Sequence, residues 1–199
     1  MEESDSYITL SGSGEGIFKD KGSKFLAFAH PVTDEDEIAK LLSAYRKKYY
    51  DARHHCYAWM LGANKKHFRA NDDGEPSGTA GKPILNQILS AGITDVLVVV
   101  VRYFGGVKLG TSGLINAYKQ SAMEAISHAP KVQKTVNEDI TARFPYHLLN
   151  EVMRVCKEEG LVPELQYEAE HIRFTCLVRK SCAKKFAQKI SSIYGVELT

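Results

Sequence analysis

The pattern of apolar and polar positions in the first 130 residues alternates between the periods of a helix and a strand. Ile38, Leu41 and Tyr45 fall at helical spacing, in a segment with acids in its first turn and basic residues in its last. The valine-rich run near residue 100 predicts a strand covered on both faces. The predicted elements are a hairpin over 14–32, a helix over 34–50, a strand over 54–63, a polar loop over 64–81, a helix over 83–92, a strand over 95–103 and a helix over 114–129.

After Pro130 the pattern changes to shorter elements. The segments are a strand over 131–144, a helix over 146–160, strands over 161–170 and 171–180, a helix over 181–195 with Ser181 as its N-cap, and a short strand over 196–199. This order is the split β-α-β motif of ferredoxin-like domains. We therefore predict an α+β chain with an N-terminal α/β domain over 1–130 and a C-terminal ferredoxin-like βαββαβ domain over 131–199.

Composition places the chain among ordinary globular proteins. Of 199 residues, 44% are hydrophobic and 25% are charged. The formal net charge of +2 predicts no strong bulk attraction to nucleic acid or membrane, so any polyanion must bind a local cluster. The four cysteines include no C-x-x-C pair, which favours a reducing cytoplasm. The N-terminus lacks a signal-peptide pattern, and no apolar run approaches the ~18 residues of a membrane span.

Three acids lie within four residues of a loop that is rich in glycine and hydroxyl groups. The oxygens of Asp72, Asp73 and Glu75 could hold Mg²⁺ through one or two carboxylates, with water or phosphate as further ligands. The alternative is an ordinary turn, because Asp-Gly and Pro-Ser-Gly are common turn sequences. The spacing is not that of an EF-hand. The sequence leaves metal binding and a plain turn both open.

A second loop follows the buried strand at Arg102 and leads into a helix. Backbone N–H groups at a helix start favour anions, and Arg102 and Lys108 would add positive charge. The loop matches neither a Walker A nor a G-x-G-x-x-G phosphate loop. The alternative is that Arg102 pairs with one of the three acids and joins the two loops, because buried charges are usually paired. The predicted anion-binding residues are Arg102, Gly105, Gly106, Lys108, Gly110, Thr111, Ser112, Ser77 and Thr79.

His54, His55 and Cys56 stand together in the strand predicted over 54–63. Adjacent strand residues face opposite ways, so His54 and His55 cannot easily bind one metal ion. Cys56 is interpreted as a core residue, because no acid that would orient a Cys–His pair is identifiable.

The C-terminal part is basic, with six Lys and Arg residues and no acid between His171 and Val196. A solvated helix face is the usual explanation for such a run. A basic face on a ferredoxin-like domain could also contact RNA phosphates, although the aromatic signature of an RRM is missing. The predicted nucleic-acid-binding residues are Arg179, Lys180, Lys184, Lys185 and Lys189.

Two long blocks resemble the IMPACT family, whose bacterial members are called YigZ-type proteins. They are DDGEPSGTAGKPILNQ over 72–87 and VLVVVVRYFGGVKLGTSGLI over 96–115, with SKFLAFAHPV and DARHHCYAWMLG as upstream blocks. Together they cover most of residues 22–120. The chain departs from the family pattern at Asn71, Ser112 and Asn116, where Ser, Gly and Arg are common. An anion-binding role of that arginine would not carry over to Asn116.

The resemblance implies an N-terminal domain like the second domain of a small-subunit ribosomal protein. It also implies a C-terminal domain like the last domain of elongation factor G. Eukaryotic relatives regulate translation by contacting the activator of a starvation-responsive initiation-factor kinase. The leading hypothesis is therefore a cytoplasmic protein that binds RNA, the ribosome or a translation-factor protein. Two alternatives are a metal-dependent enzyme for a phosphorylated or nucleotide substrate, for which no general base with a partner is identifiable, and a protein-partner module whose acidic loop meets a basic surface.

Overall fold

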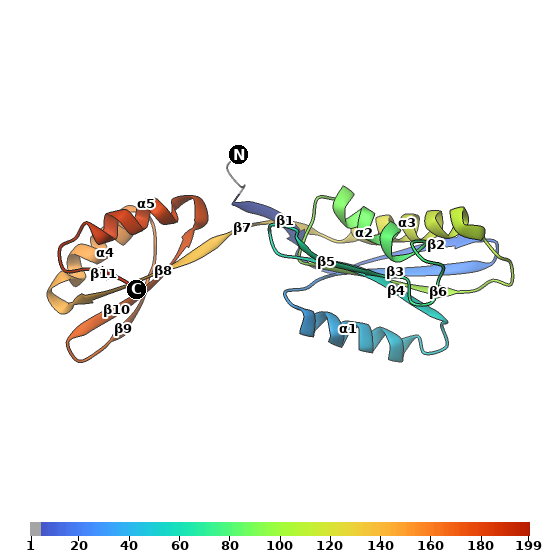
Figure 1. Cartoon of the computed structure of the whole chain (residues 1–199), viewed down its shortest axis with the longest axis horizontal. Helices are drawn as coiled ribbons and strands as arrows, with labels where there is room; N and C mark the ends of the chain where they lie inside the picture. The colour runs from blue at the N-terminus through green and yellow to red at the C-terminus, as the bar shows by residue number, and fades with distance from the viewer. Residues whose placement is uncertain (1–4) are drawn as a thin grey trace. The chain divides into compact units, whose positions relative to one another are not determined.

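The computed structural model describes residues 5–199 and divides them into two compact units (Figure 1). One unit is Tyr7–Lys134, and the other is Thr135–Thr199 together with Asp5 and Ser6. Each unit has its own sheet and its own hydrophobic core, and the chain is α+β. The domain limits of 1–130 and 131–199 that the sequence suggests stay a prediction.

An antiparallel five-stranded sheet forms the centre of the N-terminal unit. Its strands, in spatial order, are β2 (Gly14–Asp20), β3 (Ser23–Pro31), β6 (Val96–Tyr103), β4 (His54–Leu61) and β5 (His67–Asn71). The middle strand, β6, is buried from Val96 to Val101. Its side chains enter two different cores, since Val98 and Val100 contribute to one core and Val99 and Val101 to the other. The prediction of a strand covered on both faces is confirmed.

Helices cover both faces of this sheet (Figure 1). α1 (Glu35–Lys48) lies on one face, and α2 (Gly81–Ser90) and α3 (Gly110–His128) lie on the other. The Asp34 carboxylate caps α1 by accepting a hydrogen bond from the Glu37 backbone N–H at 2.8 Å. The acids that follow and the basic last turn suit the helix dipole, as the sequence predicts.

Predicted boundaries beside both loops differ from the structure, and α2 covers 81–90 where 83–92 was predicted. The segment predicted as a polar loop contains β5, an edge strand whose first four side chains are all exposed. An exposed edge strand has no apolar alternation, so the pattern could not reveal it. α3 begins at Gly110 rather than at Leu114, because its first turn carries the exposed residues Thr111 and Ser112 and so has no apolar periodicity.

The single strand predicted over 131–144 is two strands. β7 (Lys131–Thr135) forms a two-stranded sheet with β1 (Ser6–Leu10), which the sequence did not predict. β8 (Asn137–Pro145) belongs to the sheet of the C-terminal unit. The alternation runs through both strands, and only their different pairing partners separate them.

The C-terminal unit has the chain order β-α-β-β-α-β. Its sheet, in spatial order, is β11 (Glu197–Leu198), β8, β10 (His171–Arg179) and β9 (Glu164–Tyr167), with antiparallel neighbours throughout. A 3-10 turn, η1 (Tyr146–Leu148), leads into α4 (Leu149–Glu158), and α5 (Lys180–Ser191) begins one residue before the predicted N-cap. Both helices share one core with the sheet. Among residues 5–199, no helix combines the length and the apolar composition that crossing a membrane requires.

We expect Gly14→Ala to destabilise the N-terminal unit. A Cβ on Gly14 would lie 2.2 Å from the Ala125 carbonyl oxygen and 2.5 Å from the Ala129 backbone nitrogen, so β2 and α3 would have to separate. Such overpacking costs about 1–3 kcal/mol. That exceeds the ~0.4–1 kcal/mol that alanine gains by restricting the unfolded chain. Urea unfolding measures the difference. Gly12→Ala is the control, because its Cβ would meet only the Pro130 ring at 3.0 Å; equal stability of the two variants would contradict the close β2–α3 contact.

Candidate functional site

Arg102, near the end of β6, forms a buried ion pair with Glu75 of the loop between β5 and α2. Arg102 Nη1 lies 2.6 Å from Glu75 Oε1, and only 7% and 3% of the two side chains are exposed. The Tyr118 hydroxyl of α3 donates to the same oxygen at 2.8 Å. The two loops therefore meet in space, as expected. Of the three acids that the sequence left open as partners of Arg102, the partner is Glu75.

The Arg102 guanidinium is also held by aromatic rings. Its central carbon lies 5.4 Å from the centroid of Phe25, its cross-strand neighbour on β3, and 5.6 Å from that of Phe104. Its Nε has no hydrogen-bond partner among the described residues. Because Arg102 is 6% exposed and paired inward, its main role in this arrangement is to join β6, the acidic loop and α3.

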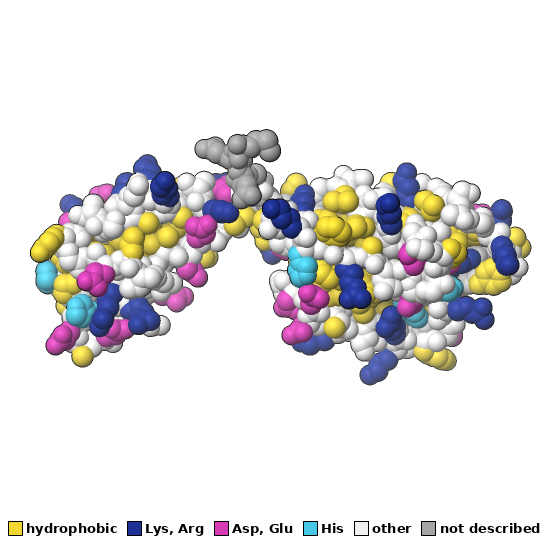
Figure 2. All heavy atoms as spheres, viewed as in Figure 1, with side chains coloured by type: hydrophobic (Ala, Val, Ile, Leu, Met, Phe, Trp, Pro, Cys, Tyr) yellow, Lys and Arg dark blue, Asp and Glu magenta, His cyan; other side chains and the backbone are white. Residues whose placement is uncertain are grey.

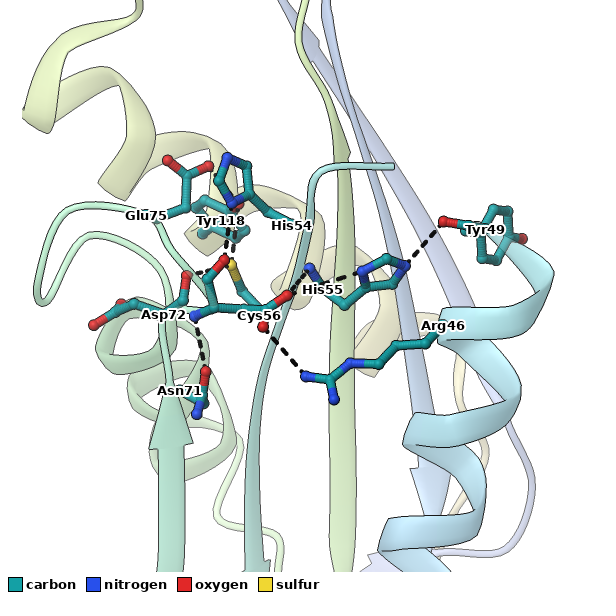
Figure 3. A network of polar contacts seen from close by, with 10 residues as sticks. Arg46, Tyr49, His54, His55, Cys56, Asn71, Asp72, Glu75 and Tyr118 are labelled. Atoms are coloured by element: carbon teal, nitrogen blue, oxygen red, sulfur yellow. Dashed lines mark hydrogen bonds and ion pairs between the residues drawn. The ribbon is translucent and has the colours of Figure 1, made fainter. Parts of the chain in front are cut away.

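A polar network continues from Glu75 into the core (Figure 3). The Cys56 thiol lies 3.3 Å from the Tyr118 hydroxyl oxygen and donates to the Asp72 carbonyl oxygen at 3.0 Å. Burial raises the pKa of the Cys56 thiol and of the Tyr118 hydroxyl well above their ordinary values. Cys56 is therefore a protonated thiol at neutral pH, which agrees with its interpretation as a core residue.

The Asp72 carboxylate fixes the start of α2. It accepts hydrogen bonds from the backbone N–H groups of Gly78 at 2.9 Å, Ala80 at 3.0 Å and Gly81 at 2.8 Å. Burial alone would raise the pKa of Asp72, but these hydrogen bonds outweigh it and hold the pKa below its ordinary value. A negative charge at a helix N-terminus is also favoured by the helix dipole.

The Asp73 carboxylate connects the loop to β4 and to α1. It accepts the His55 backbone N–H at 2.7 Å and lies 3.2 Å from Arg46 Nη2. The Asp73 carbonyl oxygen lies 2.8 Å from His54 Nδ1. The His54 side chain and the His55 backbone N–H thus both hold Asp73, while His55 Nε2 lies 3.1 Å from the Tyr49 carbonyl oxygen.

The three carboxylates proposed as magnesium ligands have separate protein partners. Asp72 is bound by α2, Asp73 by β4 and α1, and Glu75 by β6 and α3. Within residues 5–199, no group of three His, Cys, Asp or Glu side chains is placed to hold a metal ion. Magnesium binding stays an untested prediction, and the geometry gives it no support.

The residues predicted to bind anions fall into two sets. Arg102 and Thr79 are buried, and the Thr79 hydroxyl donates to the Pro76 carbonyl oxygen at 2.7 Å. The Gly105 N–H donates to the Ser23 hydroxyl at 3.1 Å. The exposed members are Ser77, Gly106, Lys108, Gly110, Thr111 and Ser112. Anion binding stays a prediction, which now concerns this exposed set.

A groove between α2 and α3 adjoins the exposed set. It has a volume of about 300 Å³ and is lined by Gly78, Lys82, Pro83, Asn86, Gln87, Ile115 and Lys119, none of them acidic. These residues and Tyr118 are not among the site residues predicted from the sequence. The available signals were the spacing of four between Lys82 and Asn86 and between Ile115 and Lys119, and the phenol hydroxyl of Tyr118 on a largely apolar face of α3.

The predicted basic face of the C-terminal unit is partly neutralised by acids from elsewhere in the chain. Arg179 makes two hydrogen bonds, of 2.7 and 2.8 Å, with Asp5, and the hydrogen bond from Arg179 lowers the pKa of Asp5 to about 2. Lys189 pairs with Glu159. Lys184 and Lys185 are exposed on α5. Figure 2 shows acidic side chains interspersed among the Lys and Arg side chains of both units.

The chain is similar in sequence to a known protein family and in structure to a solved protein. A model of the Impact N-terminal domain matches residues 21–126, which include both loops. IMPACT family member YvyE of Bacillus subtilis is 32% identical over 94% of this chain and 87% of its own length. IMPACT family member YigZ of Escherichia coli is 38% identical over 75% and 74%. The protein IMPACT homolog of Saccharomyces cerevisiae is 35% identical over 46% and 36%. A crystal structure of a hypothetical protein matches at 28% identity with a TM-score of 0.75, over 98% of this chain and 96% of its own.

We expect Glu75→Gln to destabilise the N-terminal unit strongly, because it leaves the Arg102 guanidinium buried without a counter-charge. Breaking a buried ion pair costs about 3–5 kcal/mol, measured here by urea unfolding. The double variant Glu75→Gln/Arg102→Met removes both charges and is expected to recover most of that loss. A loss below about 1 kcal/mol in the single variant would contradict a structural role for the pair.

The pH dependence of stability tests the role of Asp72. Its folded pKa lies below the ordinary value of 3.8, so its contribution is present above pH 3.8 and is lost as pH falls through the folded pKa. The difference in unfolding free energy between the protein and Asp72→Asn should therefore be largest near neutral pH and shrink in acid. Urea unfolding at neutral and acid pH measures it. A difference independent of pH would show that the charge of Asp72 does not hold the start of α2.

Proposed function

The chain belongs to the IMPACT family, and on that premise we propose that it regulates translation by binding RNA of the translation apparatus, with the ribosome as its partner. The eukaryotic relatives to which the sequence analysis points regulate translation. The observation that carries RNA binding is the uncompensated positive charge along the groove between α2 and α3 and on the loop that leads into α3.

Three lysines supply this charge. Lys82 and Lys119 flank the groove between α2 and α3, and Lys108 is exposed on the loop that leads into α3. Within residues 5–199, none of the three makes an ion pair with an acid. Lys108 lies just before the start of α3, which suits a phosphate group because a helix start adds N–H donors and positive potential. Lys82 and Lys119 add positive charge along the groove.

The proposal includes the fold of each domain and the cellular location. The strand order β11-β8-β10-β9 and the β-α-β-β-α-β succession support a ferredoxin-like C-terminal domain. The sheet covered by helices on both faces supports the ribosomal-protein-like N-terminal domain that the family resemblance implies. A cytoplasmic location follows from a ribosomal partner and suits four free cysteines.

The enzyme alternative draws less support from the site. Its metal ligands would be Asp72, Asp73 and Glu75, and each of these carboxylates already binds protein donors. The thiol nearest to them, Cys56, is buried and protonated. The acidic loop also offers little to a basic protein partner, because each of its three carboxylates already has a partner within the protein.

Co-sedimentation with ribosomes tests the proposal. If the three lysines each neutralise one phosphate, raising salt from about 50 to about 200 mM should weaken binding by roughly 40-fold. The triple variant Lys82→Gln/Lys108→Gln/Lys119→Gln should bind more weakly and lose most of this salt dependence. Arg102→Ala is unsuitable as a probe, because the loss of a buried ion pair would disturb the fold.

The matched control is Lys40→Gln/Lys66→Gln/Lys131→Gln, three exposed positions that change the net charge equally. It should bind like the unaltered protein. Absence of binding to ribosomes at low salt would reject the proposal. Equal losses in both triple variants would mean that bulk charge, and not the α2–α3 surface, attracts the ribosome.

A further inference from the structure

Two loops at one end of the N-terminal unit pack together as one body, which we call the tip: residues 19–24 of the β2–β3 turn and residues 104–108 after β6. A Cβ on Gly105 would lie 1.9 Å from the Gly22 carbonyl carbon and 2.2 Å from the Ser23 backbone nitrogen. The Gly105 N–H donates to the buried Ser23 hydroxyl at 3.1 Å. Only glycine allows this approach, so the tip is a preformed surface.

The tip concentrates positive charge. It contains Lys19, Lys21, Lys24 and Lys108 against the single acid Asp20, a net charge of +3 where the whole chain carries +2. Within the described part of the chain, none of these four lysines makes an ion pair. Residues 19–24 also line an open hollow of about 420 Å³. This concentration of charge is local, and the net charge of the whole chain does not reveal it.

Two features of the β2–β3 turn are unfavourable for folding alone. Lys19 and Lys24 are direct cross-strand partners, and like charges in that position repel. Lys21 has a φ of 45°, a left-handed conformation that lysine rarely adopts and that asparagine or glycine would fill at lower cost. A bound anion would relieve the repulsion, and local strain of this kind is a feature of binding sites.

An exposed aromatic ring accompanies the lysines. Phe104 is 53% exposed and Val107 is 52% exposed. The Phe104 ring lies 5.6 Å from the Arg102 guanidinium, which Glu75 holds in place from the interior. Figure 2 shows Lys or Arg side chains beside hydrophobic ones at the end of the N-terminal unit that carries the β2–β3 turn, on the right in that view. The ring is thus positioned on one side and open to solvent elsewhere.

We propose that the tip binds an unpaired stretch of RNA, with a base stacked on Phe104 and the phosphates beside Lys19, Lys21, Lys24 and Lys108. A basic surface with an exposed aromatic ring is the pattern of single-strand recognition, in which stacking tolerates any base. Duplex RNA is contacted through its backbone and shape and has no need of such a ring. This inference rests on the proposed function and names the part of the molecule that reads unpaired nucleotides.

Fluorescence anisotropy with a labelled single-stranded RNA of mixed sequence, and with the matching duplex, tests the inference. Phe104→Ala should weaken binding of the single strand by about 5- to 150-fold and of the duplex much less, and Phe104→Trp should restore it. Lys19→Gln/Lys21→Gln/Lys24→Gln should reduce the slope of log K against log salt for the single strand by about 2. The control is again Lys40→Gln/Lys66→Gln/Lys131→Gln. Urea unfolding confirms that each variant is folded.

The outcomes separate this inference from the proposed function. If the unaltered protein binds RNA or ribosomes but the tip variants behave like the control, the inference is wrong and the proposed function stands. If the tip variants lose ribosome binding and keep RNA binding, the tip contacts a protein, and the RNA assignment is overturned. If the protein binds neither single strand, duplex nor ribosome, both fail together.

Discussion

The buried ion pair between Arg102 and Glu75 is the interaction on which the candidate site depends. Removing two charges from water costs several kcal/mol for each ion unless close partners offset it. Here the offset comes from a 2.6 Å contact, the Tyr118 hydroxyl and two aromatic rings. The partners come from β6, the acidic loop and α3. If one of these three segments moved away, a buried charge would lose its partner.

The acidic loop is a joint between helices and sheet. Each of its carboxylates binds a different part of the unit: Asp72 the start of α2, Asp73 the edge of β4 and Arg46 of α1, and Glu75 the end of β6. This explains the acidic composition without a metal ion. The exposed groups near this loop that could bind a ligand are therefore lysines, hydroxyls and one aromatic ring.

Charge in this protein therefore has two separate uses. Asp72, Asp73 and Glu75 bind partners within the N-terminal unit, and in the C-terminal unit Asp5 pairs with Arg179 and Glu159 pairs with Lys189. Several lysines of the N-terminal unit have no such partner. A chain with a net charge of only +2 can in this way present a local basic surface, because lysines gather at the tip, which carries a net charge of +3.

The sequence by itself determined the elements whose signal is local. The uniform valine run predicted the central strand, the charge order and the apolar spacing predicted α1, and the alternation after Pro130 predicted the β-α-β-β-α-β order. The exposed edge strand β5 and the polar first turn of α3 left no periodicity to detect, so both were missed.

Only the tertiary structure decided which of three acids pairs with Arg102, that Tyr118 joins them, and that Asp5 reaches Arg179. These partners lie 27, 43 and 174 residues apart, and their meeting depends on strand register and helix packing. A sequence pattern reports the nature of a residue and its near neighbours. Which distant charge it faces is set by the packing of the whole unit. That packing decides whether an acid such as Glu75 pairs within the protein or stays available to a ligand.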